Sequence, residues 1–260
     1  MRFLVNSINF SKNIYRKIAH RPPKWFRQEL KIFLLQNKEN VDFKNVIIRP
    51  ILDDKFDDAG VIGGHYFHQD LFVAKKILES NPVRHVDIGS RIDGFIAHVA
   101  VFRKIEVLDI RKLESKVANI IFTQIDLMIE MLEDDFCDSI SSLHAIEHFG
   151  LGRYGDPIDA NGHLKAIKNI ARLLKSKGIF YFSVPIGNQR VEFNAHRVFA
   201  LSYLIPILKE YFEVISLSIV DDKGDFHENL EINELLMHSS FGCQYGCGIF
   251  ILERKEKNCN

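Results

Sequence analysis

Short runs of β-branched and aromatic residues alternate with helix-like stretches from residue 83 onward. Five runs have the length and composition of buried strands, and they lie at 83–88, 104–109, 120–123, 137–143 and 178–184. The stretches between them that space apolar residues as a helix does lie at 95–103, 112–118 and 164–174. This alternation predicts βαβ units. Because crossovers between parallel strands are right-handed, it also predicts a doubly wound sheet.

The carboxyl-terminal part of the chain adds two more predicted strands. A helix-like stretch at 201–211 is followed by β-branched runs at 212–220 and 248–253. The long polar segment between these runs suits an antiparallel pair at one edge of the sheet. The predicted fold class is therefore α/β, with a doubly wound, seven-stranded, mostly parallel sheet.

The amino-terminal part differs in charge and predicts a separate unit. Residues 1–50 contain eleven Lys and Arg against three acidic residues. Apolar side chains recur there at helical spacing, at Trp25, Phe26, Leu30, Phe33 and Leu34. We expect a basic helical extension over 1–60 and an α/β domain over 61–260. A solvated basic face on a helix packed against the domain or a partner is favoured, and contact with a membrane surface is the alternative.

The overall composition indicates which cellular compartment and which classes of binding partner to expect. Lys and Arg number 34, as do Asp and Glu, so the chain has no net field for gripping the phosphates of nucleic acid. The four cysteines are too few and too unevenly spaced for a disulfide framework, and no apolar run is long enough to span a membrane. We expect a soluble cytoplasmic protein that does not bind nucleic acid.

The segments after the first three predicted strands carry polar residues suited to a nucleoside. Ligands of open α/β sheets bind beyond the carboxyl ends of the strands. Gly89 allows a tight turn after the first strand, although Arg91 breaks the G-x-G-x-x-G pattern of dinucleotide sites. Asp109 follows roughly 20 residues later, where a carboxylate can accept both hydroxyls of a ribose. Asp126, after the third strand, either accepts a hydrogen bond from an adenine amino group or caps a helix.

The order and spacing of these residues resemble class I S-adenosylmethionine-dependent methyltransferases, together with the segment 138–148 that ends in Glu147 and His148. More closely, segments 64–70, 87–94 and 142–156 resemble an uncharacterised methyltransferase-like family of bacterial surface-polysaccharide loci. The resemblance implies a Rossmann-like methyltransferase fold, S-adenosylmethionine over strands one to three, and an acceptor above strands four and five. The cofactor-binding residues that it implies are Tyr66, Gln69, Asp87, Gly89, Ser90, Arg91, Asp109, Ile110, Asp126, Leu127 and His144.

Two histidines are candidate general bases for methyl transfer to a hydroxyl. A helix that begins after the fourth strand would place His144, Glu147 and His148 on one face. Histidine has the unperturbed pKa best suited to base catalysis near neutral pH, so His148 is the first candidate for the base. Glu147 would orient or bind the acceptor. A capping or packing role for His148 is about equally supported. After the fifth strand, His196 and Arg197 could hold a hydroxylated or anionic acceptor, and a surface ion pair is the alternative for Arg197.

The remaining polar residues leave alternatives open. His65, Tyr66, His68 and Gln69 could fold over the cofactor as a lid. No metal site is expected, because the histidines lack a compact ligand spacing and the cysteine pair near residue 245 lacks a second pair. The predicted activity is O-methylation of a sugar or other small polar acceptor in surface glycan biosynthesis. The alternative, motivated by Arg91, is a binding protein of the same fold that does not transfer methyl groups.

Overall fold

The computed structural model describes residues 22–129 and 132–256, within two units, Met1–Val61 and Ile62–Asn260. In the first unit, helix α2 (Lys24–Gln36) is present where the apolar spacing predicts it, and none of its side chains is buried. Two short turns follow, η1 (Asn37–Glu39) and η2 (Asp54–Phe56). Lys55 pairs with Glu29 and lies over the ring of Trp25. Within the described residues, no helix is long and apolar enough to cross a membrane.

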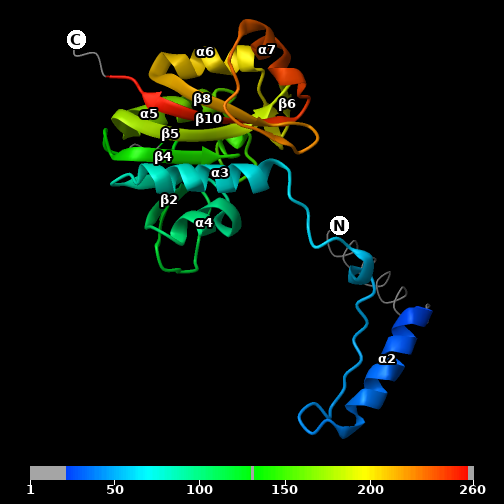
Figure 1. The fold of residues 1–260 in the computed structure, drawn as a ribbon. Coiled ribbons are helices and arrows are strands. Elements are labelled where there is room, and N and C mark those ends of the chain that lie inside the picture. Colours follow the sequence, from blue (N-terminus) through cyan, green and yellow to red (C-terminus); the bar gives the residue numbers. More distant parts are fainter. Residues whose placement is uncertain (1–21, 130–131, 257–260) are drawn as a thin grey trace. The chain divides into compact units, whose positions relative to one another are not determined.

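The second unit is built on a sheet with strand order β3-β2-β1-β4-β5-β10-β8-β9 (Figure 1). Its parallel part consists of β1 (His85–Ile88), β2 (Ile105–Asp109), β3 (Ile120–Gln124), β4 (Cys137–Leu143) and β5 (Leu174–Ile186). Its antiparallel part consists of β10 (Gly246–Arg254), β8 (Phe212–Val220) and the short β9 (Phe226–His227). All seven predicted strands are present, and β8 and β10 form the predicted antiparallel pair. In the part of the chain that the structure describes, the sheet has eight strands and not seven, because the short β9, which the sequence did not predict, pairs with β8. A separate hairpin joins β6 (Arg190–Glu192) to β7 (His196–Val198).

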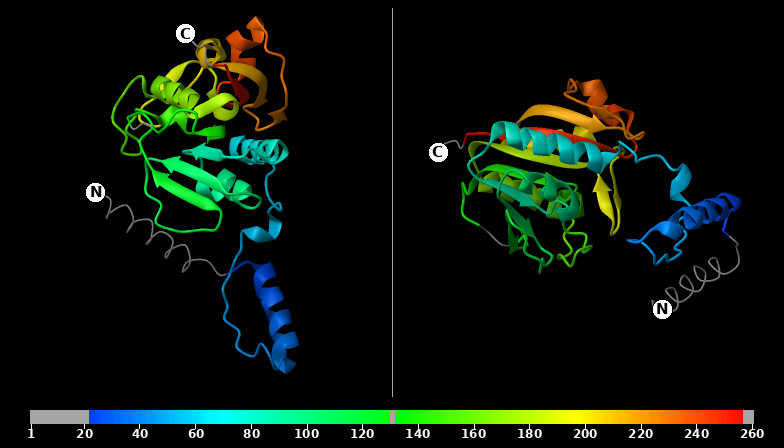
Figure 2. Two further views of the ribbon diagram at one scale, coloured as in Figure 1. Left: turned by 90° about the vertical axis from the view of Figure 1, so that its left-hand side faces the viewer. Right: turned by 60° about the horizontal axis from the view of Figure 1, so that its bottom comes forward.

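Helices cover both faces of this sheet, which confirms the doubly wound class (Figure 2). Helix α3 (His65–Ser80) and the turn η3 (Ile92–Ile96) with α4 (Ala97–Ala100) pack on one face. Helices α5 (Gly162–Leu173) and α6 (Leu201–Tyr211) pack on the other, and α7 (Glu234–Ser239) follows β9. The alternation of β5 shows the two faces, because Tyr181 joins the α3 cluster while Phe180 and Phe182 join the α5 cluster.

The apolar spacing that predicts α5 is also what fixes it to the sheet. Ala166, Ile167, Ile170 and Ala171 recur three and four residues apart, and all four are buried. The helix ends at Leu173, and β5 begins at once, a few residues earlier than the predicted 178–184. The strand pairing skips residues between Leu174 and Ile179, so Gly178 lies beside a bulge within β5.

The helix predicted at 112–118 is wrong, because residues 112–117 form no regular structure. This segment offers only Leu113 and Val117 as larger apolar residues, and Val117 is exposed. One such pair cannot bury an apolar stripe against the sheet, and propensity alone does not hold a helix this short. The connection between β2 and β3 therefore crosses without a helix and ends at Asn119, whose φ is 67°.

The strand order reverses between β1 and β4, which places a crevice at the carboxyl edge of the sheet. The carboxyl ends of β1 to β5 all point to this edge. Because β10 runs antiparallel to β5, its first residues lie at the same edge. Side chains from residues far apart in the sequence can therefore meet there.

Candidate active site

A cavity of about 330 Å³ lies at this carboxyl edge, within the range of small-molecule sites. It is lined by residues that follow β1, β2, β3 and β4, and by Tyr245 just before β10. Most of the predicted site residues line it. Three of the predicted cofactor-binding residues do not, namely Gln69, Asp87 and Ser90, and neither does Arg197.

The turn after β1 forms one wall of the cavity. Gly89 has a φ of 70°, and a Cβ at this position would lie 3.0 Å from the Cβ of Ala145, so only glycine fits without strain. Arg91 lies at the rim, where its guanidinium pairs with Asp93 at 3.2 Å and lies 4.8 Å from the centre of the Tyr66 ring. Its side chain is half exposed, so it does not fill the turn.

Asp87 and Ser90 hold this turn together from inside the sheet. The carboxylate of Asp87 accepts hydrogen bonds from the Ser90 main chain at 3.0 Å, from the Ser90 hydroxyl at 2.6 Å and from the Ser141 hydroxyl at 2.6 Å. Burial raises the pKa of Asp87 to about 7, although these three hydrogen bonds oppose it. The Ser90 hydroxyl also accepts from the main chain of Leu143 at 3.0 Å, which ties the turn to β4.

The carboxylate of Asp109 stands at the end of β2, and Arg111 binds both of its oxygens. The guanidinium donates to Oδ2 at 2.6 Å and to Oδ1 at 2.9 Å, and the Arg111 main chain donates to Oδ1 at 2.8 Å. Arg111 also lies 4.5 Å from the centre of the Tyr154 ring. A ligand hydroxyl would therefore replace part of this ion pair. Arg111 was missed from the sequence, although its place two residues after a site carboxylate is a signal that could have found it.

The neighbouring wall comes from the segments after β2 and β3. Ile110, Asp126 and Leu127 all line the cavity. The Asp126 carboxylate accepts a hydrogen bond from the main chain of Met128 at 2.9 Å, so it caps a turn and also faces the cavity. Both roles proposed from the sequence are thus geometrically open to it.

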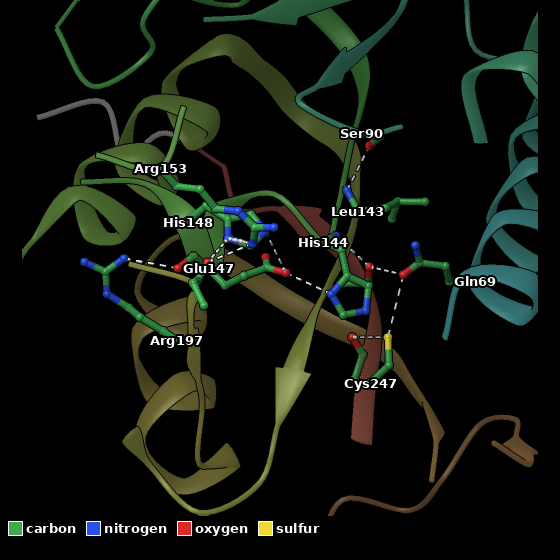
Figure 3. Close-up of polar contacts among 12 residues, drawn as sticks. Gln69, Ser90, Leu143, His144, Glu147, His148, Arg153, Arg197 and Cys247 are labelled. Atoms are coloured by element: carbon green, nitrogen blue, oxygen red, sulfur yellow. Dashed lines mark hydrogen bonds and ion pairs between the residues drawn. The ribbon is translucent and has the colours of Figure 1, made fainter. Parts of the chain in front are cut away.

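The segment after β4 forms a polar corner (Figure 3). His144 Nδ1 donates to Glu147 Oε1 at 2.8 Å, and both side chains are buried. Burial disfavours a charged His144 ring, but the Cys247 sulfur and the Glu147 carboxylate outweigh it and raise its pKa well above the ordinary value. Glu147 Oε2 is buried without a hydrogen-bond partner among the described residues.

The helix expected to begin at His144 is wrong in extent. His144 has a φ of 50°, outside the helical region, and only the turn η4 (Ile146–His148) forms. The left-handed residue directs the chain across the edge of the sheet before the turn begins. The predicted clustering of His144, Glu147 and His148 still occurs, through side-chain contacts across this turn.

His148 is held so that one ring nitrogen faces Glu147. Its Nδ1 donates to the carbonyl oxygen of Ala195 at 2.6 Å, which leaves Nε2 as the unprotonated nitrogen of the neutral ring. Nε2 lies 3.8 Å from Glu147 Oε1. Arg153 donates to the same Ala195 carbonyl at 3.0 Å. Burial lowers the pKa of His148, which favours the neutral ring near pH 7.

The β6–β7 hairpin contributes His196 to the cavity, but Arg197 has another role. His196 lines the cavity, and its ring centre lies 5.2 Å from that of Tyr245. Arg197 is 5% exposed and donates to main-chain carbonyls of Glu147, Phe149, Asp159 and Ala160. It therefore neither binds an acceptor nor forms a surface ion pair, because its donors are used to fix the cavity wall.

The first turns of α3 replace the predicted lid. Tyr66 lines the cavity, while Gln69 is 1% exposed and accepts from the Ser183 hydroxyl at 2.6 Å. The segment is helical from His65 onward, so it is a fixed wall and not a loop over a ligand. Tyr245 was missed from the sequence, because only the antiparallel course of β10 brings it to this edge.

The fold is similar to those of solved structures that include a methyltransferase and a cyclase. The 1,6-didemethyltoxoflavin-N1-methyltransferase of Burkholderia thailandensis, solved with bound S-adenosylhomocysteine, matches with 14% identity and a TM-score of 0.52 over 72% of this chain and 79% of that chain. The cyclase SpnF matches with 13% identity and a TM-score of 0.53 over 73% of this chain and 82% of that chain. A comparison with curated proteins gave no match.

One family model covers the polar corner and most of the cavity. It is described as Caenorhabditis protein of unknown function, DUF268, and it matches residues 93–243, more than half of the chain. The matched range runs from the turn after β1 through the β6–β7 hairpin to the residues before β10. The chain therefore belongs to the family described as Caenorhabditis protein of unknown function, DUF268.

Proposed function

We propose that this protein is a class I S-adenosylmethionine-dependent methyltransferase that methylates a hydroxyl group of a small polar acceptor, such as a sugar. The observation that carries the proposal is the arrangement of one cavity with two polar ends. Asp109 stands at one end, and the buried pair Glu147 and His148 stands at the other. Because SpnF, which has a similar fold, is a cyclase, the fold alone does not specify methyl transfer, and the proposal depends on these side chains.

The cofactor end fits an adenosyl group. The Asp109 carboxylate can accept two ribose hydroxyls once Arg111 turns away from it, and the Gly89 turn lets a ligand approach the main chain closely. Asp126 and Leu127 line the wall where an adenine ring would lie. When bound, S-adenosylmethionine supplies an electrophilic methyl group on a sulfonium sulfur. The methyltransferase structure with bound S-adenosylhomocysteine has the same fold, which supports this choice of cofactor.

The acceptor end fits a hydroxyl group. Glu147 lines the cavity, and its Oε2 is a buried carboxylate oxygen with no hydrogen-bond partner among the described residues, so it can accept a hydrogen bond from a ligand. His148 lines the cavity, its Nδ1 is bound to Ala195, and its Nε2 lies 3.8 Å from Glu147 Oε1, so Nε2 is the nitrogen left to accept a proton. Tyr154 and Tyr245 add ring faces and phenol groups, which suit a hydroxylated acceptor such as a sugar.

Different residues position the acceptor hydroxyl and remove its proton. Glu147 orients the acceptor hydroxyl, and His148 Nε2 accepts its proton as the oxygen becomes the nucleophile. The Ala195 carbonyl stabilises the resulting imidazolium through Nδ1–H. The walls fixed by Asp87 and Arg197 keep the two ends at a constant separation, and this positioning provides most of the acceleration.

The test measures turnover and cofactor affinity separately. A panel of nucleotide-linked sugars, glycan precursors and small phosphorylated metabolites is screened for acceptor-dependent release of S-adenosylhomocysteine. On an acceptor that reacts, His148→Ala should lower kcat by about 100-fold or more, the size of a general-base contribution, with affinity for S-adenosylhomocysteine nearly unchanged. His227→Ala, an exposed histidine on β9, serves as the matched control and should keep full activity.

Two other results would change the assignment. Equal turnover in His148→Ala and the parent would remove His148 as the base. A selective turnover defect in His196→Ala would place the base on the β6–β7 hairpin and leave the His144–His148 segment as a wall of the cavity.

A binding protein without transfer activity is the second candidate function. The ion pair between Arg111 and Asp109 favours it, because that pair occupies the carboxylate that a ribose would need. This candidate predicts no methyl transfer to any acceptor in the panel, whether or not S-adenosylhomocysteine binds.

We further propose that the protein acts in the cytoplasm on a precursor of a surface glycan, as the resemblance to a family of polysaccharide loci implies. The basic first unit would contact the membrane peripherally. On α2, Ile32, Phe33 and Leu35 are exposed next to basic residues, which supports this contact. Sedimentation with vesicles that contain anionic lipid should carry the full chain down in low salt and much less of it in high salt.

A further inference from the structure

Three metal-ligand side chains converge beside the cavity although they lie far apart in the sequence. His65 comes from the first turn of α3, His144 follows β4, and Cys247 lies near the start of β10. Each offers one ligand atom, and these three atoms all lie within 4.8 Å of one another. The expectation of no metal site was based on spacing along the chain, which does not reveal this cluster.

His144 is already oriented as metal-binding histidines are. Its Nδ1 donates to the Glu147 carboxylate at 2.8 Å, the contact that fixes the ring of a ligand histidine in many metal sites. Its other nitrogen, Nε2, is buried and has no hydrogen-bond partner within the described part of the chain. A buried ring nitrogen without a partner is rare enough to need an explanation. A metal ion would provide one.

Figure 3 shows this second nitrogen of His144 on the side of the ring that faces Cys247. Within the described part of the chain, the hydrogen bonds of the Cys247 thiol are long, 3.7 Å to Gln69 Oε1 and 3.9 Å to the carbonyl oxygen of Gly248, and its sulfur also acts on the neighbouring His144 ring. Cys247 is fully buried and forms no disulfide. Its thiol is therefore available to a stronger partner.

His65 completes the cluster from the helix. Its ring is stacked on that of His144, with ring centres 5.2 Å apart and planes 4° from parallel. Around a tetrahedral zinc ion, with bonds of about 2.0 to 2.3 Å, ligand atoms stand about 3.3 to 3.7 Å apart. The three atoms thus need to approach by about 1 Å, which a side-chain rotation of the partly exposed His65 can provide.

We propose that His65, His144 and Cys247 bind one thiophilic divalent transition-metal ion, with Zn²⁺ as the representative ion. Two imidazoles and one thiolate are ligands that zinc prefers, and a water molecule would take the fourth position. Binding releases the thiol proton of Cys247 and any proton on His144 Nε2 to the solvent, so charge and atoms balance. The ion would join α3 to β4 and β10, and it would fix the cavity wall that carries Tyr66 and Tyr245.

The experiment uses the full chain, freed of metal with a chelator and titrated with Zn²⁺ in competition with a chromophoric chelator. We expect one Zn²⁺ per chain. With Co²⁺ as a second probe, we expect a thiolate-to-metal charge-transfer absorption and the intense visible bands of a tetrahedral site. Cys247→Ala should abolish the charge-transfer absorption. It should also weaken Zn²⁺ binding by at least about 100-fold. Loss of a residue that only supports a ligand weakens metal binding by about 10- to 100-fold, and Cys247 is a direct ligand in this proposal.

Two further variants keep the test decisive. His65→Ala, at a partly exposed position, should weaken Zn²⁺ binding as strongly as Cys247→Ala while the thiolate absorption survives at saturating Co²⁺. Cys243→Ala, which removes a neighbouring buried cysteine outside the cluster, should leave both metals bound as in the parent. Circular dichroism confirms that each variant folds. Zn²⁺ binding by the parent that is no tighter than in Cys247→Ala would overturn the proposal, whether or not methyl transfer is found.

Discussion

Replacing Arg197 should lower the stability of the second unit strongly, because its guanidinium bridges two segments of the cavity wall. Nη1 donates to the Phe149 carbonyl at 2.7 Å, and Nη2 donates to the Ala160 carbonyl at 3.1 Å. The contacts with Glu147 and Asp159 carbonyls are longer, at 3.3 and 3.4 Å. Hydrogen bonds to a charged group contribute about 1.5 to 3 kcal/mol each, so the two shorter ones alone give about 3 kcal/mol or more.

The substitution Arg197→Met keeps the aliphatic stem and removes the donors. It should lower the free energy of unfolding by about 3 kcal/mol, because carbonyls that bind Arg197 are left buried without partners. Arg197→Lys should lose about half as much, since one ammonium cannot reach both segments. Urea unfolding followed by circular dichroism measures both changes, and the slope of the transition should stay constant.

The matched control is Arg190→Met, on the same hairpin. Arg190 also contacts main-chain carbonyls and pairs with Glu192 at 2.8 Å, but its side chain is 36% exposed. Water can replace its contacts, so the expected loss is about 1 kcal/mol or less. Equal losses in Arg197→Met and Arg190→Met would refute the idea that burial makes Arg197 a structural clamp.

Three further predictions concern the cavity. Asp109→Ala should weaken binding of S-adenosylhomocysteine more than tenfold in calorimetry, since two charge-assisted hydrogen bonds of about 1.5 to 3 kcal/mol each are lost and water replaces them in part. Arg111→Ala frees the same carboxylate and should not weaken binding of S-adenosylhomocysteine. Weaker binding in Arg111→Ala alone would contradict the ribose role of Asp109. The kcat/KM for methyl transfer should be flat above pH 7 and fall as pH drops below about 6.5, because burial lowers the pKa of His148 and only its neutral form accepts a proton. An acid limb that persists in His148→Ala would assign it to another group. Gly89→Ala should lower stability by about 1 to 2 kcal/mol, the cost of a left-handed conformation, and narrow the cavity beside Ala145; an unchanged urea midpoint would show that the turn relaxes.

The strands and the site carboxylates were predictable because their signals are local. β-branched runs mark β1 to β5, and the rule that ligands bind at the carboxyl ends of strands is enough to bring Asp109 and Asp126 to one edge. The helix prediction for 112–118 was wrong because Leu113 and Val117 have helical spacing, but one such pair does not form an apolar face that could pack on the sheet. The spacing of apolar residues is the same in a helix that packs on the sheet, such as α5, and in a segment that stays irregular, such as 112–118.

The tertiary contacts were not predictable in the same way. Arg197 looks like a surface residue in the sequence, and only the path of the β6–β7 hairpin shows that four carbonyls surround it. His65, His144 and Cys247 meet because α3 begins at the same edge where β4 ends and β10 starts. Their spacing along the chain does not predict this cluster, since the three residues lie on segments far apart in the sequence.

Calorimetric titration of the full chain with S-adenosylmethionine, S-adenosylhomocysteine and NAD tests the central claim most directly. The cavity with Asp109 and the Gly89 turn at one end predicts that both sulfur compounds bind at one site per chain and compete with each other. NAD should not bind, because Arg91 breaks the glycine pattern that receives a pyrophosphate. Binding of NAD without binding of either sulfur compound would contradict the account.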